Sequence, residues 1–178
     1  MLIGVLALQG AVSEHCAALD SLNISNKGVR NTKDMRYIDV LIMPGGESTT
    51  LRKLLVNANL WDLIMKSDMP IMGTCAGAIL LGKSDDITFE KMDYIIDRNY
   101  YGRQIDSFEE VLEIEDYPDF RGVFIRAPAI TDIGKTRAIA YCKGSVVGCI
   151  EGKNMALTFH PELTGDSYFH KMWIDTLD

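Results

Sequence analysis

A cysteine between two spaced glycines is the first feature of this sequence that could do chemistry. Residues 73–77 are Gly-Thr-Cys-Ala-Gly, which fits the nucleophile-elbow pattern G-x-S-x-G with cysteine in place of serine. The glycines allow a sharp turn from strand to helix, and this turn holds the side chain of Cys75 out over the sheet edge. At a helix N-terminus, the dipole and the backbone N–H groups favour the thiolate. The pattern predicts a nucleophilic Cys75, with a buried cysteine between packing glycines as the alternative.

A nucleophilic thiol needs a base, and the chain has three histidines. His15 has polar neighbours in the first predicted helix, and His170 belongs to the last one, so both are expected at the surface. His160 instead ends an apolar run of strand length. Catalytic groups gather where parallel strands end, which places His160 at the same sheet edge as Cys75.

Pro161 and Glu162 follow this histidine directly. Proline cannot continue a strand and fixes its own φ, so it can hold the carboxylate of Glu162 within reach of the imidazole of His160. We therefore expect Cys75, His160 and Glu162 to act as nucleophile, base and orienter. The alternative is a strand-end histidine beside a solvated glutamate.

Two adjacent glycines, Gly45 and Gly46, follow a second buried strand. Such glycines can free backbone N–H groups to face an oxyanion, although an ordinary strand-to-helix turn is the alternative. Neither Gly10 nor Gly45 begins a G-x-G-x-x-G fingerprint, and no Walker A sequence occurs, so a dinucleotide-binding site is not indicated.

Alternating strands and helices must position these residues. Apolar runs and helical spacing in the first half predict strands over 2–8, 24–30, 39–43 and 69–73. Helices are predicted over 11–22, 51–58 and 60–66, and a compact helix that ends at Leu81 follows residues 74–77. This alternation predicts a parallel, doubly wound sheet. The second half has closely spaced strand candidates over 109–115, 122–126, 129–133, 136–142, 145–151 and 154–159, followed by a helix over 166–177. Such runs indicate antiparallel extensions, with some strands returning to the main sheet.

Composition indicates an ordinary globular protein of one domain, residues 1–178. Hydrophobic residues make up 47% and charged residues 24%, which excludes a disordered or collagen-like chain. The net charge of −7 argues against a nucleic-acid-binding face. The first apolar run stops at Gln9, too early for a signal peptide or a membrane span, so a cytoplasmic protein is expected. The remaining cysteines, Cys16, Cys142 and Cys149, lack metal-type spacing and are expected to be reduced core thiols.

Six segments distributed over the chain resemble one family. They are Leu8-Gln9-Gly10, Pro44-Gly45-Gly46-Glu47-Ser48-Thr49, Gly73-Thr74-Cys75-Ala76-Gly77, Tyr101-Gly102-Arg103-Gln104, Phe124-Ile125-Arg126-Ala127-Pro128 and Thr158-Phe159-His160-Pro161-Glu162. The chain resembles the class I, triad-type glutamine amidotransferases, and among them the glutaminase subunits of pyridoxal 5′-phosphate synthases. The implied fold is α/β, a three-layer α/β/α arrangement of the flavodoxin-like kind with a mostly parallel central sheet. Two departures are Tyr100, where the family commonly has serine, and a short segment over 83–91.

The resemblance implies hydrolysis of L-glutamine to glutamate and ammonia through a thioester on Cys75, without a metal or organic cofactor. It implies an oxyanion hole from Gly46 and Ala76. The implied glutamine contacts are Gly46, Glu47, Ser48, Arg103, Ile125 and Arg126. Two arginines suit a substrate with an α-carboxylate, although surface ion pairs are the alternative.

The implied partner is a synthase subunit that receives the ammonia within a large hetero-oligomer, with Gln9 coupling the two proteins. Three alternatives remain open at this stage. They are a glutaminase of another pathway such as imidazole glycerol phosphate synthase, a catalytically silent interaction module on the same fold, and a cysteine hydrolase that works alone.

Overall fold

A seven-stranded sheet forms the centre of the computed structural model, which describes residues 1–100, 107–115, 117 and 119–178. The strand order is β2-β1-β3-β4-β11-β10-β9. The first five strands in this order are parallel to one another. Their bounds are β1 (Ile3–Leu6), β2 (Asn26–Val29), β3 (Val40–Met43), β4 (Ile71–Thr74) and β11 (Asn154–Leu157).

Antiparallel strands extend this sheet at one side. Strands β9 (Arg137–Cys142) and β10 (Ser145–Glu151) form a hairpin, and β10 pairs antiparallel with β11. Two small antiparallel sheets are separate from the main one: β5 (Ile95–Asp97) with β8 (Ala129–Asp132), and β6 (Phe108–Val111) with β7 (Arg121–Phe124). The predicted return of a late strand to the main sheet is confirmed, because β11 lies next to β4.

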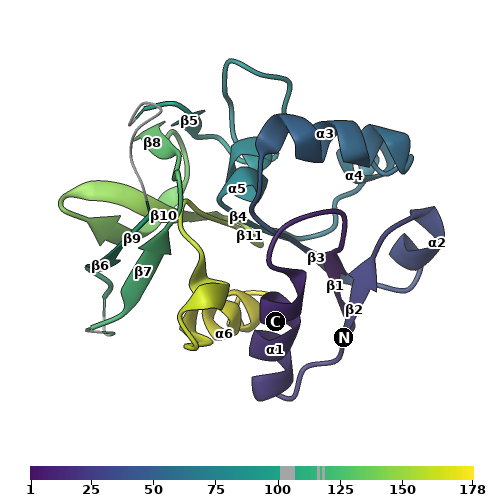
Figure 1. Cartoon of the computed structure of the whole chain (residues 1–178), viewed down its shortest axis with the longest axis horizontal. Helices are drawn as coiled ribbons and strands as arrows, with labels where there is room; N and C mark the ends of the chain where they lie inside the picture. Colours follow the sequence, from purple (N-terminus) through teal and green to yellow (C-terminus); the bar gives the residue numbers. More distant parts are fainter. Residues whose placement is uncertain (101–106, 116, 118) are drawn as a thin grey trace.

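Helices cover both faces of the sheet (Figure 1). Their bounds are α1 (Val12–Ser21), α2 (Thr32–Met35), α3 (Ser48–Asn57), α4 (Trp61–Lys66), α5 (Ala76–Leu81), the 3-10 helix η1 (Pro161–Leu163) and α6 (Tyr168–Asp175). Alternate residues of β3 enter different cores: Leu41 and Met43 pack with α3 and α5, whereas Val40 and Ile42 pack with α1 and α6. This alternation follows from the two-residue period of a strand. The three-layer, mostly parallel α/β/α fold predicted from the sequence is therefore confirmed.

Three short elements were not predicted: helix α2, strand β5 and the 3-10 helix η1. Helix α2 begins after Asn31, whose side chain accepts hydrogen bonds from the backbone N–H groups of Lys33 and Asp34. Strand β5 has only three residues, of which Ile96 alone is buried. Within the described residues, no helix has the length and apolar character needed to cross a membrane.

Candidate active site

The turn that carries Cys75 depends on two glycines. A Cβ atom on Gly77 would lie 2.0 Å from the carbonyl oxygen of Met43, and one on Gly73 would lie 2.6 Å from the carbonyl carbon of Gly77. Strand β4, helix α5 and strand β3 therefore approach more closely than any side chain would permit. Between the glycines, Cys75 has φ +48°, a conformation that is costly for a residue with a side chain and that marks functional turns.

Strand β11 brings His160 to this turn. The backbone N–H of Cys75 donates to the carbonyl oxygen of Leu157 at 2.8 Å, so the end of β11 lies directly beside the nucleophile position. Three residues later, the backbone N–H of His160 donates to the carbonyl oxygen of Val123 at 2.8 Å. His160 is thereby held between β11 and β7, with its imidazole at the edge where Cys75 follows β4.

Glu162 completes the cluster. Its Oε1 lies 2.7 Å from Nδ1 of His160, and its side chain is fully buried. Burial alone would lower the pKa of His160, but hydrogen bonds with Cys75 and Glu162 outweigh burial and raise this pKa to about 10. At neutral pH the imidazole of His160 is therefore a cation. The structure brings the predicted nucleophile, base and orienter together.

The prediction that His15 and His170 lie at the surface is wrong. Both side chains are fully buried. Nδ1 of His15 lies 2.9 Å from Nε2 of His170, and Nε2 of His15 lies 3.3 Å from Oγ1 of Thr74. The same Nε2 lies 3.4 Å from Oε2 of Glu162. Helix α6 packs over α1 at this point, so the polar neighbours of His15 in the sequence do not decide its burial.

The loop after β3 packs against the cluster through Gly45. A Cβ on this residue would lie 2.5 Å from Cε1 of His160 and 3.1 Å from Cβ of Cys75. The next residue, Gly46, has φ +130° and would also meet the side chain of Gln9 at 2.6 Å if it carried a Cβ. Nε2 of Gln9 donates to the carbonyl oxygen of Glu47 at 2.9 Å. The loop between β1 and α1 thus holds the loop between β3 and α3.

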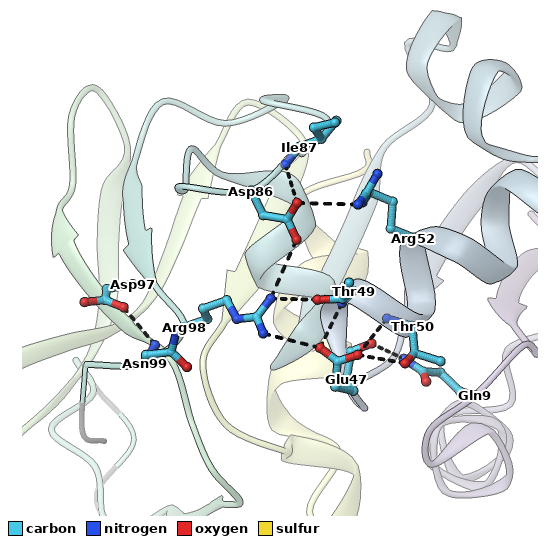
Figure 2. Close-up of polar contacts among 10 residues, drawn as sticks. All are labelled: Gln9, Glu47, Thr49, Thr50, Arg52, Asp86, Ile87, Asp97, Arg98 and Asn99. Atoms are coloured by element: carbon cyan, nitrogen blue, oxygen red, sulfur yellow. Dashed lines mark hydrogen bonds and ion pairs between the residues drawn. The ribbon is translucent and has the colours of Figure 1, made fainter. Parts of the chain in front are cut away.

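The carboxylate of Glu47 caps helix α3 (Figure 2). It accepts hydrogen bonds from the backbone N–H groups of Thr49 and Thr50, at 3.0 and 2.7 Å, and from Oγ1 of Thr50 at 2.7 Å. Partial burial raises the pKa of Glu47, but the hydrogen bonds from Thr50 and Thr49 outweigh it and lower the pKa to about 2. The predicted glutamine-contact residue Glu47 therefore uses its side chain to start the helix.

Arg98 is a residue that sequence reasoning missed. It follows β5 and reaches across to the start of α3, as Figure 2 shows. Its Nη1 donates to Oγ1 of Thr49 at 2.7 Å, and its Nη2 lies 3.7 Å from Oε1 of Glu47. Asp86 lies 3.6 Å from Arg98 and also 3.6 Å from Arg52. The sequence shows that an arginine precedes Asn99, but nothing in its position predicts a contact with Thr49, about fifty positions earlier in the chain.

The other predicted substrate contacts lie around this edge. Ser48 is buried at the first position of α3, and Ala76 begins α5 directly after Cys75. Ile125 and Arg126 follow β7 and are exposed, and the carbonyl oxygen of Ile125 lies 3.9 Å from Sγ of Cys75. Arg103, together with the rest of its Tyr-Gly-Arg-Gln segment, lies outside the described residues.

The remaining cysteines differ in burial. Cys149 is fully buried, and burial raises its pKa to about 12. Cys142 is buried, whereas Cys16 is only partly buried and packs against the edge of the core. All four cysteines are unpaired. Among the described residues, no cluster of three or more histidines, cysteines or acidic residues could hold a metal ion.

The sequence matches known proteins over nearly its whole length. The family model described as the SNO glutamine amidotransferase family matches residues 5–178. The chain is 46% identical over 173 residues to pyridoxal 5′-phosphate synthase subunit PdxT of Methanocaldococcus jannaschii, covering 94% of this chain and 93% of that protein. It is 43% identical over 187 residues to the protein of the same name from Thermoplasma acidophilum, covering 98% and 92%.

Solved structures with the same fold include a glutamine amidotransferase with 38% identity and a TM-score of 0.89, covering 98% of this chain and 97% of that one. A glutamine amidotransferase of Thermotoga maritima has a TM-score of 0.61 at 16% identity, covering 99% and 83%. At that identity, the second likeness concerns the fold alone.

Proposed function

This chain belongs to the SNO glutamine amidotransferase family, and from that membership we propose that it is the glutaminase subunit of a pyridoxal 5′-phosphate synthase. In this role it hydrolyses L-glutamine and supplies ammonia to a synthase subunit. The observation that carries the proposal is the match to relatives named pyridoxal 5′-phosphate synthase subunit PdxT, which are 41–46% identical over nearly the whole chain. The buried cluster of Cys75, His160 and Glu162 supports the same conclusion.

The chemistry begins with the thiolate of Cys75, which attacks the carbonyl carbon of the glutamine side-chain amide. The carbonyl oxygen becomes an oxyanion that the backbone N–H groups of Gly46 and Ala76 stabilise. As the C–N bond breaks, the imidazolium of His160 gives its proton to the leaving nitrogen, which departs as ammonia. Cys75 is then a γ-glutamyl thioester.

Hydrolysis of the thioester returns the enzyme to its starting state. His160, now neutral, takes a proton from a water molecule, and the resulting hydroxide adds to the thioester carbonyl. The C–S bond breaks, glutamate is released and the thiolate–imidazolium pair forms again. Glu162 holds the ring of His160 in position through both halves and stabilises its cationic form, as the third group of a triad does. The scheme uses only protein groups and water.

Substrate binding is assigned to residues around the same edge. Arg103 and Arg126 supply guanidinium groups that suit the α-carboxylate of glutamine, because the planar fork binds a carboxylate through two hydrogen bonds. The proposed set also contains Gly46, Glu47, Ser48 and Ile125. Since the carboxylate of Glu47 already caps α3, its contribution to glutamine binding comes from the main chain.

The partner is a synthase subunit with which the chain forms a hetero-oligomer. Gln9 is the proposed coupling residue, because its side chain contacts both Gly46 and the carbonyl oxygen of Glu47. Binding of a partner at the loop after β1 would therefore reach the oxyanion loop directly. A cytoplasmic location agrees with four unpaired cysteines, since disulfides form in oxidising compartments. We propose that residues 1–178 form a single glutaminase domain.

The test is release of glutamate from glutamine, measured with and without the synthase subunit. The unchanged chain in the complex is expected to release glutamate, and Cys75→Ala is expected to release none while it keeps its circular dichroism spectrum. Cys142→Ala is the matched control, because this cysteine lies on β9 and should not affect the rate. Turnover by Cys75→Ala would refute the proposed mechanism.

The same assay separates the alternatives. A cysteine hydrolase that works alone would turn over glutamine at a rate that the partner does not change. A silent interaction module would bind the synthase subunit without being labelled by a glutamine-analogue electrophile. A glutaminase of another pathway would fail to support pyridoxal 5′-phosphate formation from a pentose phosphate and a triose phosphate.

A further inference from the structure

All three histidines of the chain lie in one buried network. His160 contacts Oε1 of Glu162 at 2.7 Å, and His15 contacts Oε2 of the same carboxylate at 3.4 Å. His170 continues the network from the other side of His15, with 2.9 Å between its Nε2 and Nδ1 of His15. Only His160 belongs to the proposed triad, so the other two need a separate explanation.

The partners of His15 determine which ring nitrogen carries its proton. Nε2 faces Oε2 of Glu162, and an ionised carboxylate can only accept hydrogen bonds. If Nε2 lacked its proton, two acceptors would face each other in a site from which water is excluded. The proton therefore belongs on Nε2, which is hydrogen-bonded with Oγ1 of Thr74 at 3.3 Å and lies 3.4 Å from Oε2 of Glu162.

His170 leads to the same assignment. Its Nδ1 is buried and has no hydrogen-bond partner in the described structure. If Nε2 of His15 carries the proton, Nδ1 of His15 accepts from Nε2–H of His170, and the unpartnered Nδ1 of His170 is only an acceptor. The opposite arrangement would leave a buried N–H without a partner, which native proteins rarely tolerate. Both ends of the network thus favour protons on Nε2 of His15 and of His170.

Glu162 needs a second polar neighbour. Its side chain is fully buried, and Oε2 has no complete hydrogen bond among the described residues. Nε2 of His15 lies 3.4 Å from this oxygen, and a small rotation of the carboxylate or the imidazole would align its N–H for a hydrogen bond. Catalytic hydrogen bonds are often long before substrate binds and shorten in the complex. Without His15, the outer oxygen of a buried carboxylate would lose this donor.

We propose that His15 is a positioning residue that orients the carboxylate of Glu162 toward His160 by donating from Nε2–H, with His170 fixing the tautomer of His15. The proposal rests on the proposed glutaminase function, because it assigns to His15 an effect on the same triad. It adds to that function a residue from α1 and one from α6, neither of which touches the substrate.

The charge of His15 fits this role. Burial, followed by the nearby charges of His170 and His160, lowers the pKa of His15 well below its usual value. His15 is therefore neutral, and it offers Glu162 a dipole without a competing positive charge. The negative charge of Glu162 remains available to His160.

The first test measures the tautomer directly in the unchanged chain. In a 15N-labelled sample at pH 7, two-dimensional 1H–15N spectra of the imidazoles contain only three residues, and His15→Gln identifies the signals of His15. A neutral His15 with its proton on Nε2 is expected. A proton on Nδ1, or an imidazolium, would overturn the proposal. This measurement needs neither substrate nor activity.

The second test compares three substitutions of His15 in the complex with the synthase subunit. The amide nitrogen of glutamine reaches the position of Nε2, whereas that of asparagine reaches only the position of Nδ1, and leucine has no donor. His15→Gln is expected to retain kcat within about threefold, and His15→Asn and His15→Leu to lose about tenfold with KM unchanged, a loss of the size seen for outer partners of functional histidines.

The unfolding temperatures of the His15 variants show whether a loss of kcat comes from a misplaced Glu162 carboxylate or from a protein that no longer folds. If His15→Asn keeps the kcat of the unchanged chain, or if folded His15→Gln loses as much kcat as His15→Asn, the proposal is wrong. If His15→Leu does not fold, the comparison of His15→Gln with His15→Asn and the tautomer measurement still test the proposal. Absence of glutamate release by the unchanged complex would instead refute the proposed function, and the tautomer measurement would be unaffected.

Discussion

A methyl group on Gly45 would lie 2.5 Å from Cε1 of His160. Heavy atoms do not approach so closely without a shift, so the absence of a side chain at position 45 sets the place of the imidazole. The same methyl group would lie 3.1 Å from Cβ of Cys75. The loop that follows β3 therefore packs directly against two members of the triad.

Gly45→Ala should consequently displace His160 and lower kcat for glutamate release by about a hundredfold, because a shift near 1 Å at a reacting group can cost that much. Gly28→Ala is the matched control, since its Cβ would meet Ala7 at an ordinary 3.4 Å. The control should have normal kcat. Equal activity of both variants would contradict the packing argument.

The raised pKa of His160 predicts a pH-dependent contribution to stability. Burial opposes the cation, but contacts with Cys75 and Glu162 raise the folded-state pKa from 6.5 to about 10. A raised pKa gives stability that is fully present below pH 6.5 and is lost as the pH rises through 10. Glu162→Gln removes one of the two causes, so His160 should titrate at a lower pH in this variant.

The measurement is an NMR titration of His160, combined with urea unfolding at pH 6, 8 and 10. The difference in unfolding free energy between the unchanged chain and Glu162→Gln should be largest at pH 6 and should decrease toward pH 10. An unchanged titration midpoint in Glu162→Gln would show that the carboxylate does not hold the imidazolium.

The other two histidines predict the opposite dependence. Burial lowers the pKa of His170 to about 4, and the pKa of His15 is also well below its usual value. Between pH 6.5 and 4 the unfolded chain takes up protons that the folded chain excludes. Stability is therefore present above pH 6.5 and decreases on acidification, by up to about 1.4 kcal/mol per pH unit for each histidine.

His170→Gln isolates this effect. Glutamine can still donate to His15 from the position of Nε2, but it does not titrate. Urea unfolding at pH 7, 6 and 5 should show a smaller decrease in unfolding free energy for this variant than for the unchanged chain. Parallel decreases in both proteins would exclude His170 as a source of the acid sensitivity.

The neighbourhood of Cys75 could be predicted because local sequence determines it. Positions 73 and 77 must be glycine because neighbouring backbone atoms leave no room for a Cβ atom. This requirement produces the G-x-C-x-G pattern, which can be recognised in the sequence alone. The placement of His160 followed from a topological rule, since parallel strands end at one edge of the sheet. Strand β11 satisfies that rule although it is separated from β4 by about eighty residues.

The burial of His15 could not be predicted in the same way. Its neighbours Ser13 and Glu14 are polar, and the residue that covers it, His170, is 155 positions away. Helix propensity and periodicity describe one element at a time, whereas this contact depends on how α1 and α6 pack against each other. Arg98 escaped prediction for the same reason, because its partners lie at the start of α3.

Arg98 also provides the last prediction. Its guanidinium joins the segment after β5 to Thr49 and Glu47, next to the loop that contains Gly46 (Figure 2). These contacts are partly exposed, so Arg98→Met should cost less than about 1 kcal/mol of stability. If the guanidinium holds the oxyanion loop, however, kcat/KM for glutamine should fall about tenfold, a fraction of what loss of an oxyanion donor costs.

Arg52→Met is the appropriate control for Arg98→Met. Arg52 shares Asp86 with Arg98, at 3.6 Å from each, but it does not contact Glu47 or Thr49 in the described structure. Loss of Arg52 therefore removes a similar charge from the same cluster and leaves the link to the oxyanion loop intact. Steady-state glutamate release in the complex should be impaired only in Arg98→Met. Equal kcat/KM in the two variants would contradict the proposed link, because of these two arginines only Arg98 contacts Thr49 and Glu47 in the described structure.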